Sequence, residues 1–247
     1  MRVAGIHAMG APVEVFEVPE PRQLADDEVL IEVMAAGVGN WDEFARTGGW
    51  DVGRQPPMAL GVEAAGTVLT AGNAAREWAP GDAVMTHPVP LRDQGTWAPQ
   101  LIAPAGLMAR KPPNVSWAAA AAFPVPALTA LQVLVDALGL VRALTGGRGA
   151  TAAANAAPAG SAAALRAVAD DGRLATITGD PPSPERGVTI TNVYVRPDGT
   201  QLGQLATQFG AGQLHVPVAA HYHLADAAQA LAQATGAHAG GAITLTP

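Results

Sequence analysis

Apolar and polar residues alternate in short runs along the first part of the chain, and apolar residues recur at helical spacing further on. Gly and Pro residues separate the short runs, which is typical of strands joined by turns. Runs of this length and spacing predict a compact antiparallel barrel. The runs are "VEVFEVPEP", "EVLIEVMAAGV", "GVEAAGTVLTAG", "GDAVMTHPV" and "TWAPQLIAP".

After Pro113 the pattern predicts a helix over residues 116–138, with a break or kink at Pro124 and Pro126. Beyond this connector, predicted helices and strands alternate, which indicates a parallel sheet covered by helices. The predicted elements are helix 161–169, strand 173–178, strand 188–195, helix 201–209, strand 215–219, helix 225–234 and strand 242–246.

Residues 150–157, "ATAAANAA", stand where a strand is expected, but Thr151 is their only β-branched residue. Central parallel strands are normally rich in Val, Ile and Leu because both of their faces are buried. An alanine-rich strand therefore fits a sheet edge better. Together the patterns predict two domains. These are a barrel over residues 1–120, with which residues 236–247 can pack, and a connector helix with an α/β domain over residues 121–247.

Composition excludes several classes of protein. With 49% hydrophobic and 14% charged residues, the chain is not expected to be disordered. The chain has 14 Lys and Arg residues against 21 Asp and Glu residues, which gives a net charge of -7. The basic residues form no stripe that could neutralise phosphates, so we expect no nucleic-acid partner. The absence of Cys excludes disulfides and thiolate metal sites and is compatible with a cytoplasmic location.

No membrane partner is expected either. The N-terminal residues lack the apolar run of a secretion signal. The longest apolar run begins at Trp117 and contains Pro124, Pro126 and Asp136, so it predicts a buried helix rather than a membrane span.

Two short patterns have both a functional and a structural interpretation. Residues 147–152, "GRGATA", match a dinucleotide-binding pattern, but they follow a predicted helix end and precede a predicted strand. This order is reversed and favours a glycine helix stop. His221 and His223 flank Tyr222 with the spacing of two metal ligands, but no third ligand lies near in sequence, which favours a solvated strand end.

Polar and aromatic residues follow two of the predicted barrel strands. In "GNWDEF", Asn40, Trp41 and Asp42 suit a substrate-contacting loop, whereas Asn40 or Asp42 would equally well cap a helix that begins at Glu43. The sequence leaves these two interpretations open. His87 follows "GDAVM" at another strand end, where a structural role is favoured over lining a pocket.

As an ordered set, the N-terminal segments resemble the catalytic domain of the medium-chain dehydrogenase/reductase superfamily. The branch they resemble most is that of the zinc-independent quinone oxidoreductases and enoyl reductases. The resemblance covers about the first 140 residues and implies an α/β fold with a GroES-like antiparallel barrel and a Rossmann-like parallel sheet. The segments are "EVLIEVMAAGVGNWDEFARTGGW", "PMALGVEAAGTVLTAG", "PGDAVMT" and "GTWAPQLIAPAGLMARKPPNVSWAAAAAFPVPALTALQVL".

The resemblance also has implications for metal and cofactor. Where zinc alcohol dehydrogenases carry Cys and His ligands, this chain has Gly39 and Val62, which leaves Glu63 alone and implies no zinc. From Val141 onward the chain resembles the second half of the family's Rossmann domain. The resemblance implies that a piece of the family's Rossmann domain is missing between Leu140 and Val141. This piece would comprise roughly 60 to 80 residues in two overlapping βαβ units and would contain the pyrophosphate turn. A truncated Rossmann-like domain without stably bound NADPH is therefore implied.

Three further positions depart from the family pattern. Gly39, Asn155 and Ala242 stand where the resemblance implies Asn, Asp and Lys, and Asn40 lies one place after the first of them. A simple deletion would leave such positions intact. We hypothesise that the chain adapted to the loss of its cofactor.

These patterns favour a small-molecule enzyme that acts on an enone- or quinone-like, polyketide-type substrate by cyclisation, isomerisation or elimination. One alternative is an NADPH-dependent, zinc-independent quinone or enoyl reductase, and another is a non-catalytic binding protein. By resemblance, a homodimer is expected. The candidate residues are Asn40, Asp42 and His87 as polar catalytic groups, with Asp42 as a base, and Trp41, Trp50, Trp97, Phe123 and Thr129 as substrate contacts.

Overall fold

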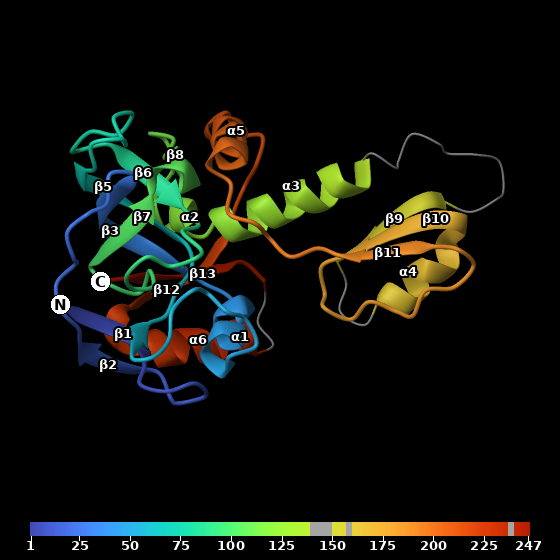
Figure 1. The fold of residues 1–247 in the computed structure, drawn as a ribbon, viewed down its shortest axis with the longest axis horizontal. Helices are drawn as coiled ribbons and strands as arrows, with labels where there is room; N and C mark the ends of the chain where they lie inside the picture. Colours follow the sequence, from blue (N-terminus) through green and yellow to red (C-terminus); the bar gives the residue numbers. More distant parts are fainter. Residues whose placement is uncertain (139–149, 157–159, 237–239) are drawn as a thin grey trace. The chain divides into compact units, whose positions relative to one another are not determined.

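The computed structural model describes residues 1–138, 150–156, 160–236 and 240–247. The chain divides into two compact units (Figure 1). Unit 1 comprises Met1–Pro126 and Pro197–Pro247, and unit 2 comprises Ala127–Arg196. This division differs from the expected one because the residues after 196 pack against the N-terminal part. Helix α5 (Gly199–Gly210) packs on strand β8 (Met108–Arg110), and helix α6 (Ala227–Thr235) packs on helix α1 (Asn40–Thr47).

Unit 1 is organised around one long strand, β3 (Glu28–Val38). Strand β5 pairs with it along one edge, whereas the other edge is shared by β7 and by the C-terminal strand β13. The resulting seven-stranded sheet has the order β12-β13-β3-β5-β6-β8, with β7 paired to β3. Its other strands are β5 (Ala64–Ala71), β6 (Ala83–Thr86), β7 (Gln100–Pro104), β8 (Met108–Arg110), β12 (Val218–His223) and β13 (Ala242–Thr246).

The expected closed barrel is not found among the described residues. Instead, β1 (Arg2–Ile6), β2 (Glu14–Glu17) and β4 (Met58–Ala59) form a separate three-stranded sheet in the order β2-β1-β4. Isolated backbone hydrogen bonds join this sheet to the segment around Trp97, such as Ala4 N to the Trp97 carbonyl at 2.9 Å. Isolated bonds do not form a ladder, so the two sheets meet without closing.

The connector breaks where the prolines predict. Helix α2 (Trp117–Ala121) begins after Ser116, whose Oγ accepts the Ala119 N–H at 3.2 Å, and helix α3 (Pro124–Leu138) begins at a proline. The strand predicted at 215–219 starts later, at Val218, directly after Pro217, which has no N–H to donate. None of the helices in the described ranges has the length and apolarity needed to cross a bilayer.

Unit 2 contains a small parallel sheet in the order β11-β10-β9. Strand β9 (Ala150–Asn155) pairs only with β10 in the part of the chain that the structure describes, which is the edge position that its alanine content predicts. Buried Leu165, Val168, Leu174 and Val188 form the core of this unit. The other elements are β10 (Val168–Thr176), β11 (Thr189–Asn192) and helix α4 (Ser161–Ala167).

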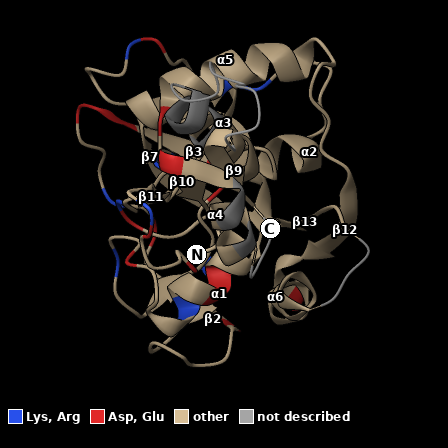
Figure 2. Cartoon of the chain, turned by 90° about the vertical axis from the view of Figure 1, so that its right-hand side faces the viewer, with Lys and Arg blue, Asp and Glu red and all other residues tan. Residues whose placement is uncertain are grey.

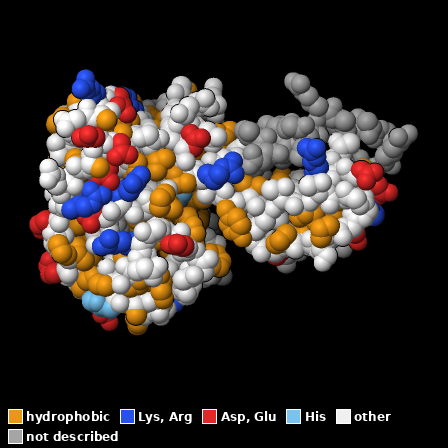
Figure 3. Space-filling model, in the orientation of Figure 1, with side chains coloured by type: hydrophobic (Ala, Val, Ile, Leu, Met, Phe, Trp, Pro, Cys, Tyr) orange, Lys and Arg blue, Asp and Glu red, His pale blue; other side chains and the backbone are white. Residues whose placement is uncertain are grey.

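Figures 2 and 3 show neither a continuous stripe of one charge nor a broad apolar face on the sides that they display. Basic and acidic positions are interspersed along the described chain (Figure 2). Hydrophobic side chains lie among polar ones on the visible face of unit 1 (Figure 3).

Alanine substitutions of Gly61 and Gly81 measure how tightly unit 1 is packed around Gly61. Gly61 and Gly81 have nearly equal φ values of +91° and +92°, but a Cβ at Gly61 would overlap with Thr96 and Trp97, whereas one at Gly81 meets nothing within 4 Å. Gly81→Ala should cost about 1–2 kcal/mol of unfolding free energy from backbone strain alone. Gly61→Ala should cost about 1–3 kcal/mol more because of the clash. Urea unfolding of both variants measures the difference, and equal losses would contradict the close packing.

Candidate active site

The candidate site lies where β3 ends and helix α1 (Asn40–Thr47) begins. Gly39 is the N-cap residue, and its N–H donates to Asp42 Oδ2 at 2.9 Å. The helix begins three residues before the predicted start at Glu43, so neither Asn40 nor Asp42 is its N-cap residue; Asp42 contributes to the cap from the third helical position. Asn40 is the first residue of the helix, and its side chain is exposed.

Capping uses only one of the two oxygens of Asp42. The residue is fully buried, and Oδ1 has no hydrogen-bond partner among the described residues. Burial raises the pKa of Asp42 to about 7, and the hydrogen bond from Gly39 offsets part of this effect. A carboxyl group with this pKa gives up and recovers a proton near neutral pH, which is the requirement for a general acid or base.

A second buried carboxyl group belongs to Glu63, directly before β5. Glu63 Oε2 accepts the N–H of Val125 at 2.8 Å. Because Pro124 has no N–H, Val125 supplies the first backbone donor of α3, and Glu63 caps this helix from another part of the chain. Burial raises the pKa of Glu63 well above its ordinary value, and the nearby charge of Asp42 raises it further. Burial and the charge of Asp42 therefore both favour the protonated form of Glu63.

Two glycines create the space for these side chains. A Cβ at Gly37 would overlap with the carboxyl group of Glu63, and a Cβ at Gly39 would overlap with the indole of Trp41. The glycine at position 39, which replaces a family side chain, therefore has a steric role here.

His87 follows β6 and is fully buried. Its Nδ1 is 2.7 Å from the Val62 carbonyl oxygen. Since a carbonyl oxygen only accepts, Nδ1 carries the proton and Nε2 is left as an acceptor, without a partner in the described part of the chain. Burial lowers the pKa of His87 to about 4, so the ring is neutral at pH 7.

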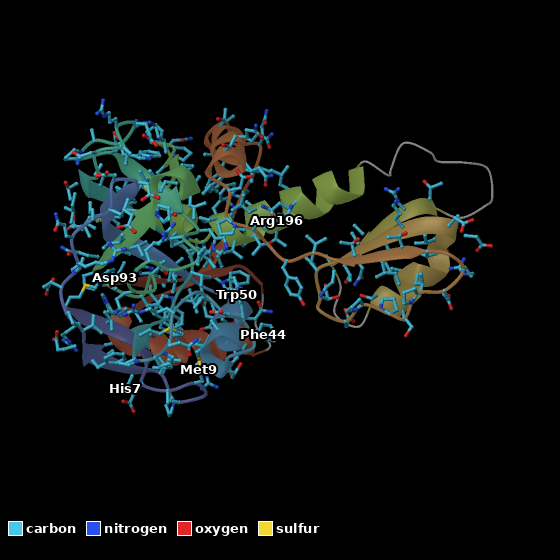
Figure 4. The ribbon with its side chains drawn as sticks, viewed as in Figure 1. His7, Met9, Phe44, Trp50, Asp93 and Arg196 are labelled. Atoms are coloured by element: carbon cyan, nitrogen blue, oxygen red, sulfur yellow. The ribbon has the colours of Figure 1, made fainter. Side chains whose placement is uncertain are left out.

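The three tryptophans differ in exposure and position. Trp97 is fully buried and donates from Nε1 to the Gly37 carbonyl at 3.0 Å, so it supports the backbone of the site. Trp41 is half-buried, and its Nε1 has no partner within the described ranges. Trp50 is also half-buried; its ring centroid lies 6.1 Å from that of His87. Trp50 N donates to the Phe44 carbonyl at 3.2 Å, and both residues lie on the same side of unit 1 in Figure 4.

The remaining two predicted contacts lie elsewhere. Phe123 is buried and stacks on Phe209 of α5 with ring centroids 4.1 Å apart, which is a core contact. Thr129 is half-buried on the part of α3 that belongs to unit 2. Glu63 was not among the candidates, although a single carboxylate inside the apolar run "MALGVEAAGTV" was a signal for it.

The donor set does not fit a metal. The described ranges contain no group of three His, Asp or Glu side chains placed to hold an ion. His221 Nδ1 contacts Thr244 Oγ1 at 2.8 Å, and His223 is exposed at the end of β12. Residues 147–149 of the "GRGATA" pattern lie outside the described residues, and residues 150–152 belong to β9.

Unit 2 contains a polar cluster at the carboxyl ends of β9 and β10. Asn155 Nδ2 donates to Ser161 Oγ at 2.9 Å, and Ser161 donates to Asp180 at 2.9 Å. Thr176 and Thr178 join the same network. Open parallel sheets bind ligands at this edge. Asn155, Ser161 and Thr176 are buried and bonded to one another, however, so the cluster stabilises the sheet edge rather than presenting free polar groups to a cofactor.

The fold and site define an α/β protein of the alcohol-dehydrogenase type in which the described residues lack the ligand set for a catalytic metal. Residues 25–112 match the alcohol dehydrogenase GroES-like domain, and residues 129–245 match the zinc-binding dehydrogenase family. The chain belongs to the medium-chain dehydrogenase/reductase superfamily. It is similar to the chloroplastic quinone-oxidoreductase homolog of Spinacia oleracea, with 35% identity over 124 residues, 48% of this chain and 36% of the relative.

Other relatives are similar over about half of the chain. A highly reducing polyketide synthase of Gibberella fujikuroi is 33% identical over 45% of this chain and 4% of its own length. The human synaptic vesicle membrane protein VAT-1 homolog-like is 30% identical over 49% of this chain, and the match spans 27% of that relative. The matched part thus amounts to 36% or less of the length of each of these three relatives.

Solved structures show the same fold. A crystal structure of an NAD-dependent alcohol dehydrogenase aligns over 100% of both chains with a TM-score of 0.84 and 22% identity. The quinone oxidoreductase of Pseudomonas syringae pv. Tomato DC3000 aligns over 100% of this chain and 99% of its own, with a TM-score of 0.82 and 18% identity.

The raised pKa of Asp42 predicts a specific pH dependence of stability. Folded Asp42 keeps its proton up to about pH 7, whereas the ordinary pKa is 3.8, so unfolding releases a proton between these values. The free energy of unfolding therefore falls as the pH rises through this window. Asp42→Asn retains an oxygen for Gly39 N–H but does not titrate, and it should remove up to about 4 kcal/mol of this decline.

Urea unfolding at several pH values across the window measures both proteins. His87, whose pKa is lowered, contributes a loss of stability towards acid pH in both of them, so its contribution cancels in the difference. The difference then reports Asp42 together with its effect on the pKa of Glu63. Parallel pH profiles would show that Asp42 is ionised in the folded protein.

The cap that Glu63 provides to α3 predicts that one substitution of Glu63 has a small effect on stability and another a large one. Glu63→Gln keeps an acceptor for Val125 N–H and should change the unfolding free energy by less than about 1 kcal/mol. Glu63→Ala removes the acceptor and leaves a cavity, and should cost about 2–4 kcal/mol. Thermal unfolding of both variants measures the contrast, and a large loss in Glu63→Gln would contradict the view that Glu63 acts mainly as an acceptor for Val125.

Proposed function

We propose that the protein is a zinc-independent oxidoreductase that reduces a conjugated carbonyl compound, an enone or a quinone, with NADPH as the reductant. The observation that carries the proposal is the buried, metal-free carboxyl group of Asp42, whose pKa is about 7. The names of the relatives, a quinone oxidoreductase homolog and polyketide synthases, support this substrate class. A mycobacterial structure of the same fold, with a TM-score of 0.80 and 22% identity, holds NADPH.

Reduction of an enone or quinone needs one hydride and one proton. The cofactor supplies the hydride when it is bound. Asp42 supplies the proton from Oδ1, because its pKa lets it release the proton to a developing enolate or phenolate and regain one from water near pH 7. The raised pKa of Glu63 favours its protonated form, which would limit the negative charge near Asp42.

A second function is favoured by one observation. In the described part of the chain β9 has a single neighbouring strand, and the family piece expected between Leu140 and Val141 would lie before it in sequence. An enzyme of this kind would use the same site for cyclisation, isomerisation or elimination without stably bound NADPH. The third interpretation is a binding protein with no turnover at all.

NADPH titration followed by thermal shift and by loss of NADPH absorbance with a quinone separates these functions. The proposal predicts binding in the micromolar range and oxidation of NADPH. Asp42→Asn should lower kcat about a hundredfold with little change in KM, because proton transfer by a positioned group contributes about that much. The exposed Asp226→Asn is the matched control and should be neutral. Absence of NADPH binding, with turnover of an enone, would favour the second function.

A homodimer and a cytoplasmic location remain part of the proposal. Both come from the family resemblance and the composition, and the net charge of -7 supports a small-molecule substrate over nucleic acid. Light scattering measures the oligomeric state, and a monomer at micromolar concentration would contradict the dimer.

A further inference from the structure

A small pocket lies in unit 1 between helices α1 and α6, which pack against each other (Figure 1). Its volume is about 340 Å³, near the lower end of the range of about 300–1,000 Å³ that is typical of small-molecule sites. Helix α6 contributes Ala228, Leu231, Ala232 and Thr235, which recur at the spacing of one helix face. Leu231 is buried and the other three are exposed, so a ligand reaches the pocket directly from solvent.

The walls of the pocket are held in place by the protein itself. Arg46 Nη1 donates to the carbonyls of Gly10 and Ala11 at 2.6 and 2.7 Å, which fixes the loop before β2 against α1. The next two residues of this loop, Pro12 and Val13, line the pocket. A ligand therefore does not have to order this wall when it binds, which favours affinity.

The charges at the pocket are balanced by an ion pair within α1. Arg46 Nε and Nη2 donate to the two carboxylate oxygens of Glu43, each at 2.7 Å, and both residues line the pocket. These hydrogen bonds lower the pKa of Glu43, so its carboxylate is ionised at neutral pH. A cationic ligand would be repelled by Arg46 and an anionic one by Glu43, so the pair favours a neutral ligand.

The polar groups that remain for a ligand are acceptors. Four hydrogen bonds occupy most of the five N–H groups of Arg46. Each carboxylate oxygen of Glu43 accepts one of them and has the capacity for a second. Thr235 Oγ1 donates its only proton within the helix, to the Leu231 carbonyl at 3.0 Å, so it too offers a ligand only lone pairs. The ligand therefore has to supply the donor.

We infer that this pocket binds a small, neutral, apolar molecule through one hydroxyl group, which donates to the carboxylate of Glu43. Glu43 is preferred to Thr235 as the acceptor because hydrogen bonds to an ionised oxygen are roughly twice as strong as those to a neutral one. Pro12, Val13 and Leu231 supply apolar surface for the rest of the molecule. Alkylphenols and compact alcohols belong to this class.

A pair of probes that differ only at the hydroxyl group tests the inference. Para-propylphenol and its methyl ether are titrated against the protein in the absence of NADPH, and ligand-detected NMR measures their affinities. The phenol should bind about tenfold or more tightly, because the ether oxygen only accepts and would face the carboxylate of Glu43. Equal affinities, or no binding of the phenol, would overturn the inference.

Substitutions of the two acceptors identify the one that binds the hydroxyl group. Glu43→Gln keeps the shape of the side chain but replaces the ionised oxygens with an amide, and should reduce the preference to about threefold. Thr235→Val removes the neutral acceptor with little change of shape and should leave the preference as in the wild type. A preference that is undiminished in Glu43→Gln would overturn the assignment.

Two tryptophan substitutions on α6 locate the binding site. Ala232 lines the pocket and is exposed, so Ala232→Trp should fill the pocket and abolish binding of the phenol. Gln229→Trp is the matched control, because Gln229 is exposed on the same helix and does not line the pocket. Asp42 does not line the pocket either. Phenol binding that persists in Ala232→Trp would place the phenol elsewhere, such as at the candidate active site, and would overturn the inference.

Light scattering of the same variants distinguishes a ligand pocket from an interface between two copies of the chain. If a second copy covered the pocket, Ala232→Trp would change the molar mass in solution and the wild type would bind neither probe. That result would overturn the inference. An unchanged molar mass together with the loss of phenol binding in Ala232→Trp would support it.

Discussion

The hydrogen bond from Val125 N–H to Glu63 joins the parts of unit 1 on which the candidate site depends. It ties the start of β5 to the first turn of α3, and it brings a carboxyl group into an interior where no Lys or Arg pairs with it among the described contacts. Gly37 makes the arrangement sterically feasible, since any side chain there would overlap with the carboxyl group. Asp42 and His87 are likewise fully buried in unit 1, whereas Trp41 is half-buried.

The burial of these side chains has an energetic cost and a chemical consequence. Buried polar atoms without partners destabilise the folded state, and three of the four in the described part of the chain belong to Trp41, Asp42 and His87. The same burial moves the pKa of Asp42 to about 7 and that of His87 to about 4, so one group exchanges a proton near neutrality and the other stays uncharged. In the proposed reaction, the proton held by Asp42 neutralises the charge that develops on the substrate.

Local patterns predicted much of the fold but not its closure. The break before Pro124 and the last strand at Ala242–Thr246 were predicted because prolines and alternation act within a few residues. The open sheet and the return of residues 197–235 to unit 1 were not, because both depend on contacts between distant segments. Asp42 and His87 were identified from their positions after strands. The role of Glu63 depends on a partner 62 residues away, which no local pattern reveals.

The central claim is that Asp42 holds a proton at neutral pH inside a metal-free site. Carbon NMR of the carboxyl group of Asp42, assigned by comparison with Asp42→Asn, measures its titration directly. The account predicts a midpoint at about pH 7. A midpoint near the ordinary value of 3.8 would contradict it, because Asp42 would then be ionised in the folded protein and have no proton to deliver.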